Sequence, residues 1–461
     1  MLNKTILEVA RGALLLTLPF LFATDASGQS SRGEITVVES RSLAFSLVSQ
    51  GQPVPARAIA LALLKRDPND IKALLVLSRA ERLMGNLKDA KRAGKRAWKT
   101  ADSSGHKFTA AMLTAQAVSS MDNKLSAQIW LRRAAQVAPN EKLKASAVRD
   151  LRFVRGSSPV SLNFDISVAP SSNINNGSKS EFIEIAGLPF ALSGDAQALS
   201  GIEYAFGSTF SYKLPTQNDW NLTAGLSLSS RFYTLSSSAK ALAPDVSGSD
   251  YAFQEVTASL VASKQDRDRK GATSLHVKAG HNWYGGSSLS QFVELGASRQ
   301  LRVGKRSSLG FNLGLQRQWR QDSDLRSSDV TNLSVTWAHA LNGGGAIWVT
   351  GYASDTASES AAIAHGNYGA TIRYTPAKPL FADTNLELAM GYSEKEFDRA
   401  QFPFSRREDK TVDASIKVIF NDLNYMGFAP TAELNAKQTS STLDQFSLED
   451  IGVKLGLRST F

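Results

Sequence analysis

Cysteine is missing from the whole sequence of 461 residues. A disulfide framework and a thiolate metal site are therefore excluded, which suits an oxidising compartment without identifying one. Long apolar runs are also scarce: only residues 13–22 form one, and it is shorter than the ~20 residues of a membrane-spanning helix. The sequence therefore predicts no bundle of membrane-spanning helices.

Charge is unevenly distributed along the chain. The formal net charge of +10 hides a basic first third, because residues 1–155 carry 25 Lys and Arg against 12 Asp and Glu, whereas residues 156–461 carry 27 against 30. Such an asymmetry indicates two domains with different partners. A basic domain can favour nucleic acid, but no recognition motif accompanies the charge, so we expect no nucleic-acid partner.

Residues 1–28 are predicted to be a secretory signal peptide. Lys4 and Arg11 precede the short apolar run, and small polar residues follow it up to Gly28. This order of charged, apolar and small residues is typical of cleaved export signals, and a buried helix is the alternative. Because no cysteine follows the run, we expect the chain itself to carry no lipid.

The next part of the chain has the period of helices and an internal repeat. Ala56, Ala90 and Ala127 recur 34 and 37 residues apart. A unit of ~34 residues is the tetratricopeptide period, in which small residues let the two helices of a hairpin pack closely. Residues 29–156 are therefore predicted to form an all-α tetratricopeptide-like solenoid, with a final capping helix. The expected helices are 36–50, 54–66, 70–84, 87–101, 107–121, 124–137 and 141–154.

A basic stripe lies on the second helix of the middle unit. Its residues recur at helical spacing and share one face. A solvated face explains the pattern as well as the functional interpretation does, which is a groove for an acidic client peptide or for phospholipid head groups. The candidate binding residues are Lys88, Lys91, Arg92, Lys95, Arg96 and Lys99.

From residue 159 onward the helical period gives way to alternation. Apolar residues take every second position of successive segments, as in 162–168, while the opposite face is polar. Short connections such as 266–271 alternate with long ones such as 170–198. Apolar outside, polar inside and alternating loop lengths are expected of a barrel surrounded by lipid. Residues 157–461 are therefore predicted to form a transmembrane antiparallel β-barrel of about fourteen strands.

The last segment alternates strictly and ends on an aromatic residue. Ile451, Val453, Leu455 and Leu457 share one face, and Phe461 keeps their parity. A terminal aromatic residue on such a strand resembles the signal that is read by the insertion machinery of outer-membrane barrels, so Phe461 is the predicted assembly signal. A soluble β-sandwich is the alternative fold, but it explains neither this residue nor the inverted polarity.

Patterns of common enzymes are absent. The sequence has no Gly-x-Ser-x-Gly, no His-Glu-x-x-His and no phosphate-binding loop. His276 and His281 are five residues apart and therefore face opposite sides of one strand. We expect no catalytic residue, no metal site and no cofactor, and a barrel phospholipase is the enzymatic alternative.

The order of signal peptide, tetratricopeptide-like helices and C-terminal barrel resembles the surface lipoprotein assembly modulator (Slam) family. Two segments carry the likeness in wording, 168–176 (VAPSSNINN) and 451–461 (IGVKLGLRSTF). Members of that family are outer-membrane translocons. The resemblance implies delivery of surface lipoproteins or small secreted proteins without nucleotide hydrolysis, the client being engaged by the periplasmic repeats.

The partners implied are outer-membrane lipids, a client lipoprotein or small secreted protein, and the barrel-insertion machinery. We expect a monomer in the cell outer membrane with its helical domain in the periplasm. Two alternatives are an exopolysaccharide export porin, which also joins tetratricopeptide repeats to a barrel, and a passive porin with a periplasmic adaptor. Asn173, Asn175 and Asn176 fit a turn better than a functional site, because asparagine tolerates left-handed backbone and caps its own chain.

Overall fold

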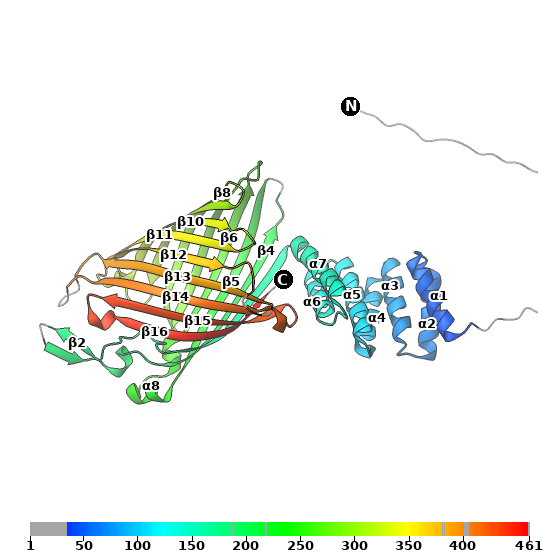
Figure 1. Cartoon of the computed structure of the whole chain (residues 1–461), viewed down its shortest axis with the longest axis horizontal. Coiled ribbons are helices and arrows are strands. Elements are labelled where there is room, and N and C mark those ends of the chain that lie inside the picture. The colour runs from blue at the N-terminus through cyan, green and yellow to red at the C-terminus, as the bar shows by residue number, and fades with distance from the viewer. Residues whose placement is uncertain are drawn as a thin grey trace, which may run out of the picture.

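The computed structural model describes residues 35–185, 188–216, 219–379, 381, 383–400 and 405–459. The predicted signal peptide and Phe461 lie outside these ranges. Figure 1 shows a row of helices that leads to one end of a β-barrel. In the described residues this row is made of α1 (Val37–Ser49), α2 (Pro53–Arg66), α3 (Ile71–Leu83), α4 (Leu87–Thr100), α5 (Ser104–Ser120), α6 (Lys124–Gln136) and α7 (Glu141–Ser157).

Local chemistry sets where the helices begin and turn. Thr36 and Glu39 open α1 with a capping box, in which the Thr36 hydroxyl accepts from the Glu39 amide at 3.2 Å and the Glu39 carboxylate accepts from the Thr36 amide at 2.8 Å. The turns inside the three helix pairs each hold one left-handed residue: Gly51 with φ 76°, Gly85 with φ 82° and Asp122 with φ 57°. Glycine adopts this backbone without strain, so the sequence ends one helix and starts its partner at these points.

Small residues bring the helices together as the repeat pattern predicts. Ala56, Ala90 and Ala127 are all completely buried. The helices approach closely at Gly94 on α4, where an added methyl group would lie 2.4 Å from Oγ1 of Thr114 on α5. The tetratricopeptide-like helical fold is confirmed. One predicted boundary was late, because Ser103 caps α5 by accepting from the His106 amide, and the helix therefore starts at residue 104.

Fourteen antiparallel strands close a barrel in the described residues, in the order β1-β16-β15-β14-β13-β12-β11-β10-β9-β8-β7-β6-β5-β4. The prediction of a fourteen-stranded barrel is confirmed. The strands are β1 (Val160–Ser171), β4 (Gly201–Leu214), β5 (Trp220–Leu235), β6 (Phe253–Gln265), β7 (Gly271–Tyr284), β8 (Ser287–Val303), β9 (Ser307–Arg320), β10 (Ser328–Ala340), β11 (Ala346–Ser358), β12 (His365–Thr375), β13 (Thr384–Phe397), β14 (Glu408–Phe420), β15 (Phe428–Ser441) and β16 (Leu448–Ser459).

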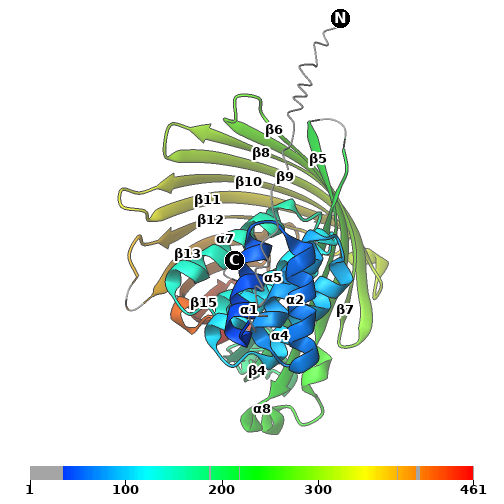
Figure 2. The ribbon, with the colours of Figure 1, turned by 90° about the vertical axis from the view of Figure 1, so that its right-hand side faces the viewer.

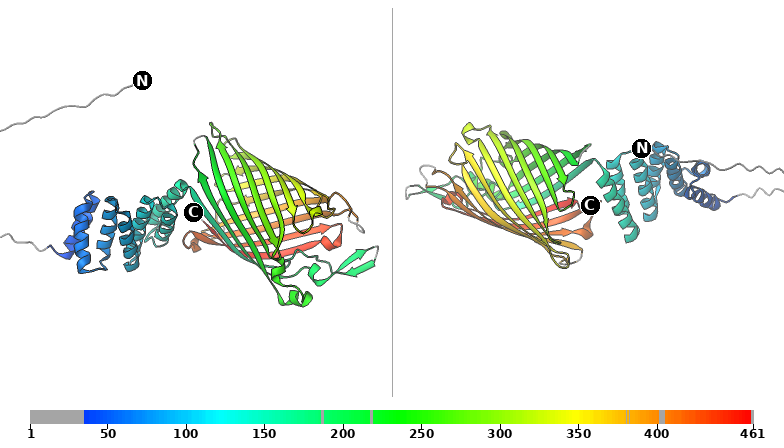
Figure 3. Two further views of the ribbon diagram at one scale, coloured as in Figure 1. Left: turned by 180° about the vertical axis from the view of Figure 1, so that it is seen from behind. Right: turned by 90° about the horizontal axis from the view of Figure 1, so that it is seen from above.

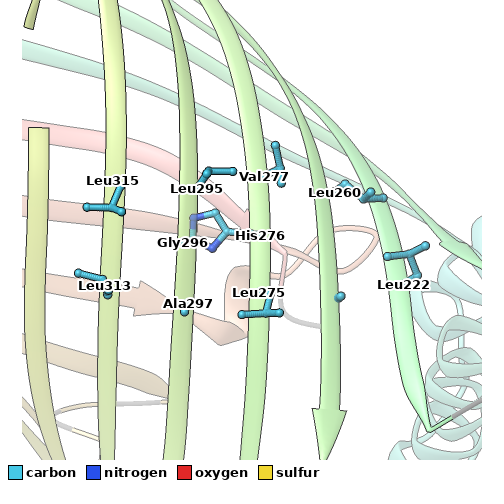
Figure 4. Close-up of a pocket in the computed structure, with 11 residues that line it drawn as sticks. Leu222, Leu260, Leu275, His276, Val277, Leu295, Gly296, Ala297, Leu313 and Leu315 are labelled. Atoms are coloured by element: carbon cyan, nitrogen blue, oxygen red, sulfur yellow. The ribbon is translucent and has the colours of Figure 1, made fainter. Parts of the chain in front are cut away.

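The barrel wall is polar inside and apolar outside. Arg458 on β16 reaches Glu387 on β13, three strands away, with 2.6 Å between Nη1 and Oε1. Side chains so far apart around the wall meet only on its concave face, so this face is the inner one. Ile451 and Leu455 on β16 have the opposite parity and are 55% and 54% exposed. Figure 4 shows leucines of the same outer face on another part of the wall, the strands β5 to β9.

The two ends of the barrel differ. At the helical end, where β1 begins and β16 ends, short turns such as 266–270 and 304–306 join the strands. At the opposite end, here the loop end, the two longest connections are 172–200 and 236–252, whereas the connection at 285–286 is a tight turn. These long loops carry α8 (Ser237–Leu242) and the hairpin of β2 (Phe182–Ile185) and β3 (Leu188–Ala191), as Figure 3 shows from two further sides. No described helix is long and apolar enough to cross a membrane.

Candidate functional site

The predicted basic stripe lies on α4 and faces solvent. Gly94 and the alanines on the other side of this helix are buried. Two stripe residues have partners within the helical block although they are exposed: Arg92 pairs with Asp89 at 3.0 Å, and Arg96 donates to the Pro68 carbonyl at 2.5 Å. The stripe residues with neither an ion pair nor a side-chain hydrogen bond among the described residues are Lys88, Lys91, Lys95 and Lys99.

A separate groove of about 470 Å³ crosses the first helix of each pair, α1, α3 and α5. Val38 and Phe45 of α1 open into it and are 68% and 61% exposed. An apolar surface left open beside cations suits a peptide that carries both apolar and acidic residues. The groove, which we call the client groove, is lined by Val38, Arg41, Ser42, Phe45, Val48, Lys72, Leu75, Val76, Arg79, Thr109 and Leu113.

The cations of the client groove are not equally available. Arg41 is held by Asp70, with 2.8 Å between Nε and Oδ2. Lys72 and Arg79 have no ion-pair partner in the described part of the chain. None of the α4 stripe residues lines this groove, so the structure does not bring the stripe and the groove together.

The client groove was missed at the level of sequence, although a signal for it existed. Val38 and Phe45 are seven residues apart and therefore share one face of α1. The buried residues Ala44 and Val48 define the core side of the same helix. Two large apolar residues off the core side of a helix indicate a binding surface.

The helical block contacts the barrel through α6. Arg132 donates from Nη1 to the Met426 carbonyl at 2.9 Å and lies over the Phe428 ring, with 5.1 Å to its centroid. Its Nη2 approaches Oγ of Ser459 at 3.4 Å. Gln136 accepts from the Met426 amide at 2.8 Å. These contacts, which we call the dock, join α6 to the β14–β15 turn and to the end of β16.

Charges of alternating sign cross the inner wall beside the dock. Glu387, Lys417, Glu433 and Lys454 are directly opposite one another on β13, β14, β15 and β16. Lys417 and Glu433 form an ion pair at 3.2 Å. A similar group lies across the barrel, where Glu294 accepts from Lys278 at 2.9 Å and contacts His276 at 2.7 Å. In both groups, acidic and basic side chains on the inner wall compensate one another.

Positive charge gathers at the helical end instead, where Lys270 has an ion-pair partner in Asp268 at 3.9 Å. The turns at 266–270 and 304–306 surround a cavity of about 480 Å³, which we call the basic vestibule. In Figure 2 the helices project over the side of this end near β4 and β15 and leave the side near β6 and β8 uncovered. The basic residues that line the vestibule are Arg269, Lys270, Arg302, Lys305 and Arg306.

The asparagine segment forms a turn at the loop end, in agreement with the structural interpretation. Asn173 bonds to Gly177 twice, through its side-chain oxygen at 2.8 Å and its nitrogen at 2.9 Å. Asn175 donates to the Gln197 carbonyl at 2.7 Å and accepts from the Leu199 amide at 2.9 Å. These amides hold the long loop 172–200 against itself.

This architecture defines an outer-membrane β-barrel protein with an N-terminal helical repeat domain. The family of surface lipoprotein assembly modifiers matches residues 161–461. The match covers more than half of the chain, so the chain belongs to that family, and the predicted resemblance is confirmed. The family and the fold are those of a barrel transporter rather than of an enzyme.

Solved structures match the two parts separately. The type III secretion translocator chaperone SycD of Yersinia enterocolitica is 19% identical and covers 26% of this chain and 83% of its own, with a TM-score of 0.24. The outer membrane channel DcaP of Acinetobacter baumannii is 12% identical and covers 66% of this chain and 98% of its own, with a TM-score of 0.38. A bacterial polysaccharide outer membrane secretin is 8% identical and covers 65% and 98%, with a TM-score of 0.34. Likenesses this weak carry no functional argument. No curated protein matches the chain.

Proposed function

We propose that this protein delivers lipoproteins across the outer membrane to the cell surface, with the helical end of the barrel in the periplasm. The observation that carries the proposal is the dock, where Arg132 and Gln136 attach a helical block to the mouth of a barrel of the lipoprotein assembly family. A client held by the helices is thereby kept within reach of the barrel.

The client groove is the proposed receptor for an incompletely folded client. Its exposed apolar side chains at Val38 and Phe45 supply contact area, and Lys72 and Arg79 supply attraction for acidic residues. The α4 stripe lies on another surface, where it adds long-range attraction that salt screens. The basic vestibule continues the same positive potential to the lumen.

The direction of client transport then comes from client binding on the periplasmic side and client folding at the cell surface. Transport therefore needs no nucleotide hydrolysis. Compensated charge inside the lumen fits this role, because a client segment meets no strong trap of either sign. An exopolysaccharide path is not favoured by the family to which the chain belongs.

The proposal is tested in the native host with and without the gene for this chain. Lipoproteins are labelled through their acyl chains with an alkyne palmitate, and intact cells are shaved with protease. We expect at least one labelled protein to lose protease accessibility in the deletion strain while its total amount is unchanged. An identical set of accessible labelled proteins in both strains would contradict the proposal.

A further inference from the structure

The basic vestibule keeps most of its positive charge. Lys270 pairs with Asp268 at 3.9 Å. The other acidic residue of the same turn, Asp266, is held by Arg299 instead, with 2.5 Å between Oδ2 and Nη2. None of the described residues that line the cavity is acidic. The lining cations without an ion pair in the described part of the chain are Arg269, Arg302, Lys305 and Arg306.

Backbone hydrogen bonds hold the turns of the vestibule in place. The Arg302 amide donates to the Lys270 carbonyl at 2.6 Å, which ties the 266–270 turn to the end of β8. The Ala340 amide donates to the Arg306 carbonyl at 2.8 Å, which ties the 304–306 turn to β10. An anion that binds between these turns therefore orders side chains but not the backbone, and its binding costs less conformational entropy.

The vestibule opens toward the lumen and not toward lipid. Leu295 on β8 belongs to the outer face and is 53% exposed. Gln300 and Arg302 have the opposite parity on the same strand, which is the parity of Glu294 and its partners on the inner wall. Phospholipid head groups surround the outside of a membrane barrel. The placement of Gln300 and Arg302 therefore favours a partner that enters the lumen.

A second cavity continues the vestibule along the inner wall. It measures about 260 Å³ and shares Ala272, Gln300 and Ser308 with the vestibule. Much of its remaining lining is small, as at Ser274, Ser298, Gly310 and Ala338. Small side chains leave room for a polypeptide segment against this part of the wall, whereas the rows of charged side chains occupy the inner wall of β13 to β16. The two cavities therefore form one continuous surface from the mouth into the lumen.

We propose that the basic vestibule is the entrance through which an acidic segment of the client polypeptide reaches the lumen, and that this segment then follows the inner wall of β7 to β10. This inference rests on the proposed function and names the chemistry of the segment that the barrel binds. Figure 2 shows the helices over the side of the mouth near β4 and β15, so they leave this entrance uncovered. Complementary charge speeds the encounter of the segment with the entrance.

Peptide binding to the purified full chain in nonionic detergent tests the entrance. The probe is a fluorescent peptide of alternating Glu and Ser residues, and its neutral match alternates Gln and Ser. We expect the acidic peptide to bind more tightly, with a dissociation constant that rises as salt is added. Arg302→Glu with Arg306→Glu should weaken its binding roughly tenfold, because each change turns an attraction into a repulsion. Unchanged binding in this double variant would overturn the proposal.

Lys378→Glu is the matched control. Lys378 is exposed on the turn between β12 and β13 at the same end of the barrel, has no ion pair among the described residues and does not line the vestibule. It changes the net charge as much as Arg306→Glu alone, but only Arg306→Glu should weaken peptide binding. Equal weakening would overturn the entrance, because net charge alone would then explain the effect. Glycerol phosphate and an oligogalacturonate are tested as competitors, and tighter binding of either than of the peptide would overturn the assignment to a polypeptide.

Single cysteines map the route inside the lumen, because the chain has no cysteine of its own. Ser308→Cys and Ser298→Cys lie on the proposed route. Ser415→Cys is the control, since Ser415 is also half-buried but lies on the inner wall of β14. Each variant reacts with the acidic or the neutral peptide carrying a maleimide. The ratio of the acidic to the neutral rate should be higher at Ser308 and Ser298 than at Ser415, and equal ratios would contradict the route.

Delivery in the native host separates this inference from the proposed function. The double variant Arg302→Glu with Arg306→Glu should reduce the surface exposure of palmitate-labelled lipoprotein toward the level of the deletion strain, while the barrel assembles in normal amounts. Unchanged exposure would overturn the entrance and leave the proposed function standing. If the unchanged chain does not raise exposure at all, the proposed function fails, and the peptide measurements still decide whether the vestibule binds an acidic chain.

Discussion

Arg132 carries much of the attachment between the two parts of the molecule. Its guanidinium donates to a backbone carbonyl of the β14–β15 turn and stacks over Phe428, which a lysine would do less well because it lacks the planar fork. Arg133, the next residue, instead stacks over Trp130 within its own helix at 4.5 Å. Two adjacent arginines therefore have different tasks, one between domains and one inside a domain.

Replacing Arg132 by alanine is expected to loosen the dock. The lost charged hydrogen bond and cation–π contact are together worth about 1–3 kcal/mol. Hydrogen exchange measured on the purified protein in detergent should become faster over the turn 421–427. Arg133→Ala removes the same charge and is the control, with no change at that turn. If the turn exchanged at the same rate in the Arg132→Ala variant as in the unchanged protein, other contacts would hold the helical block in place.

At the scale of single elements, α4 depends on a small residue. Gly94 lets this helix approach Thr114 on α5, and a Cβ there has no room. Gly94→Ala is therefore expected to lower the free energy of unfolding of the helical block by about 1–3 kcal/mol. Gly105→Ala on α5 is the matched control, since a Cβ there meets nothing within 4 Å, and it should be neutral or stabilising. Urea unfolding, followed by the helical circular dichroism signal, distinguishes the Gly94→Ala variant from the Gly105→Ala variant. Equal urea midpoints for the two variants would contradict the packing argument.

The client groove and the α4 stripe make different predictions for delivery. Val38→Ser with Phe45→Ser removes exposed apolar area and should lower surface exposure of labelled lipoprotein at any salt concentration. Reversal of Lys88, Lys91, Lys95 and Lys99 to Glu should act through long-range attraction, so its effect should shrink as salt rises, because the Debye length falls from ~10 Å at 0.1 M to ~3 Å at 1 M.

Barrel levels are the control for both sets, since neither touches the strands. Salt dependence is read on purified protein, as binding of a labelled client lipoprotein. If neither set changes exposure or binding, the helical block is not a client receptor.

How far the sequence predicted these elements depended on the kind of pattern. Period-two alternation identified every barrel strand, because side chains in lipid obey one simple rule of polarity. The hairpin of β2 and β3 and helix α8 were not predicted, since they lie in loops where no face is fixed by lipid or lumen. The client groove was missed although Val38 and Phe45 share one face of α1, because only the packing of α2 and α3 against α1 shows which face of that helix is the core side.

As a whole molecule the protein combines a closed barrel wall with a row of helices at one end. A closed ladder of strand hydrogen bonds has no edge from which to fray, so the barrel should stay folded in cold detergent and migrate differently on a gel after boiling. The mature chain should also fractionate with the outer membrane. Phe461→Asp is expected to reduce the amount of this heat-modifiable form, because the predicted assembly signal is lost, while the helical block still folds. Unchanged amounts of assembled barrel would show that Phe461 is not the signal.

Reconstitution tests the central claim most directly. The purified protein is inserted into liposomes, with its orientation determined by protease, and a palmitate-labelled lipoprotein is offered on the side of the helical block. The account predicts that the lipoprotein becomes accessible to protease on the opposite side, without nucleotide, and that removal of residues 35–157 slows this appearance. Lipoprotein that stays on the side where it was added, with the barrel shown to be assembled, would contradict the account.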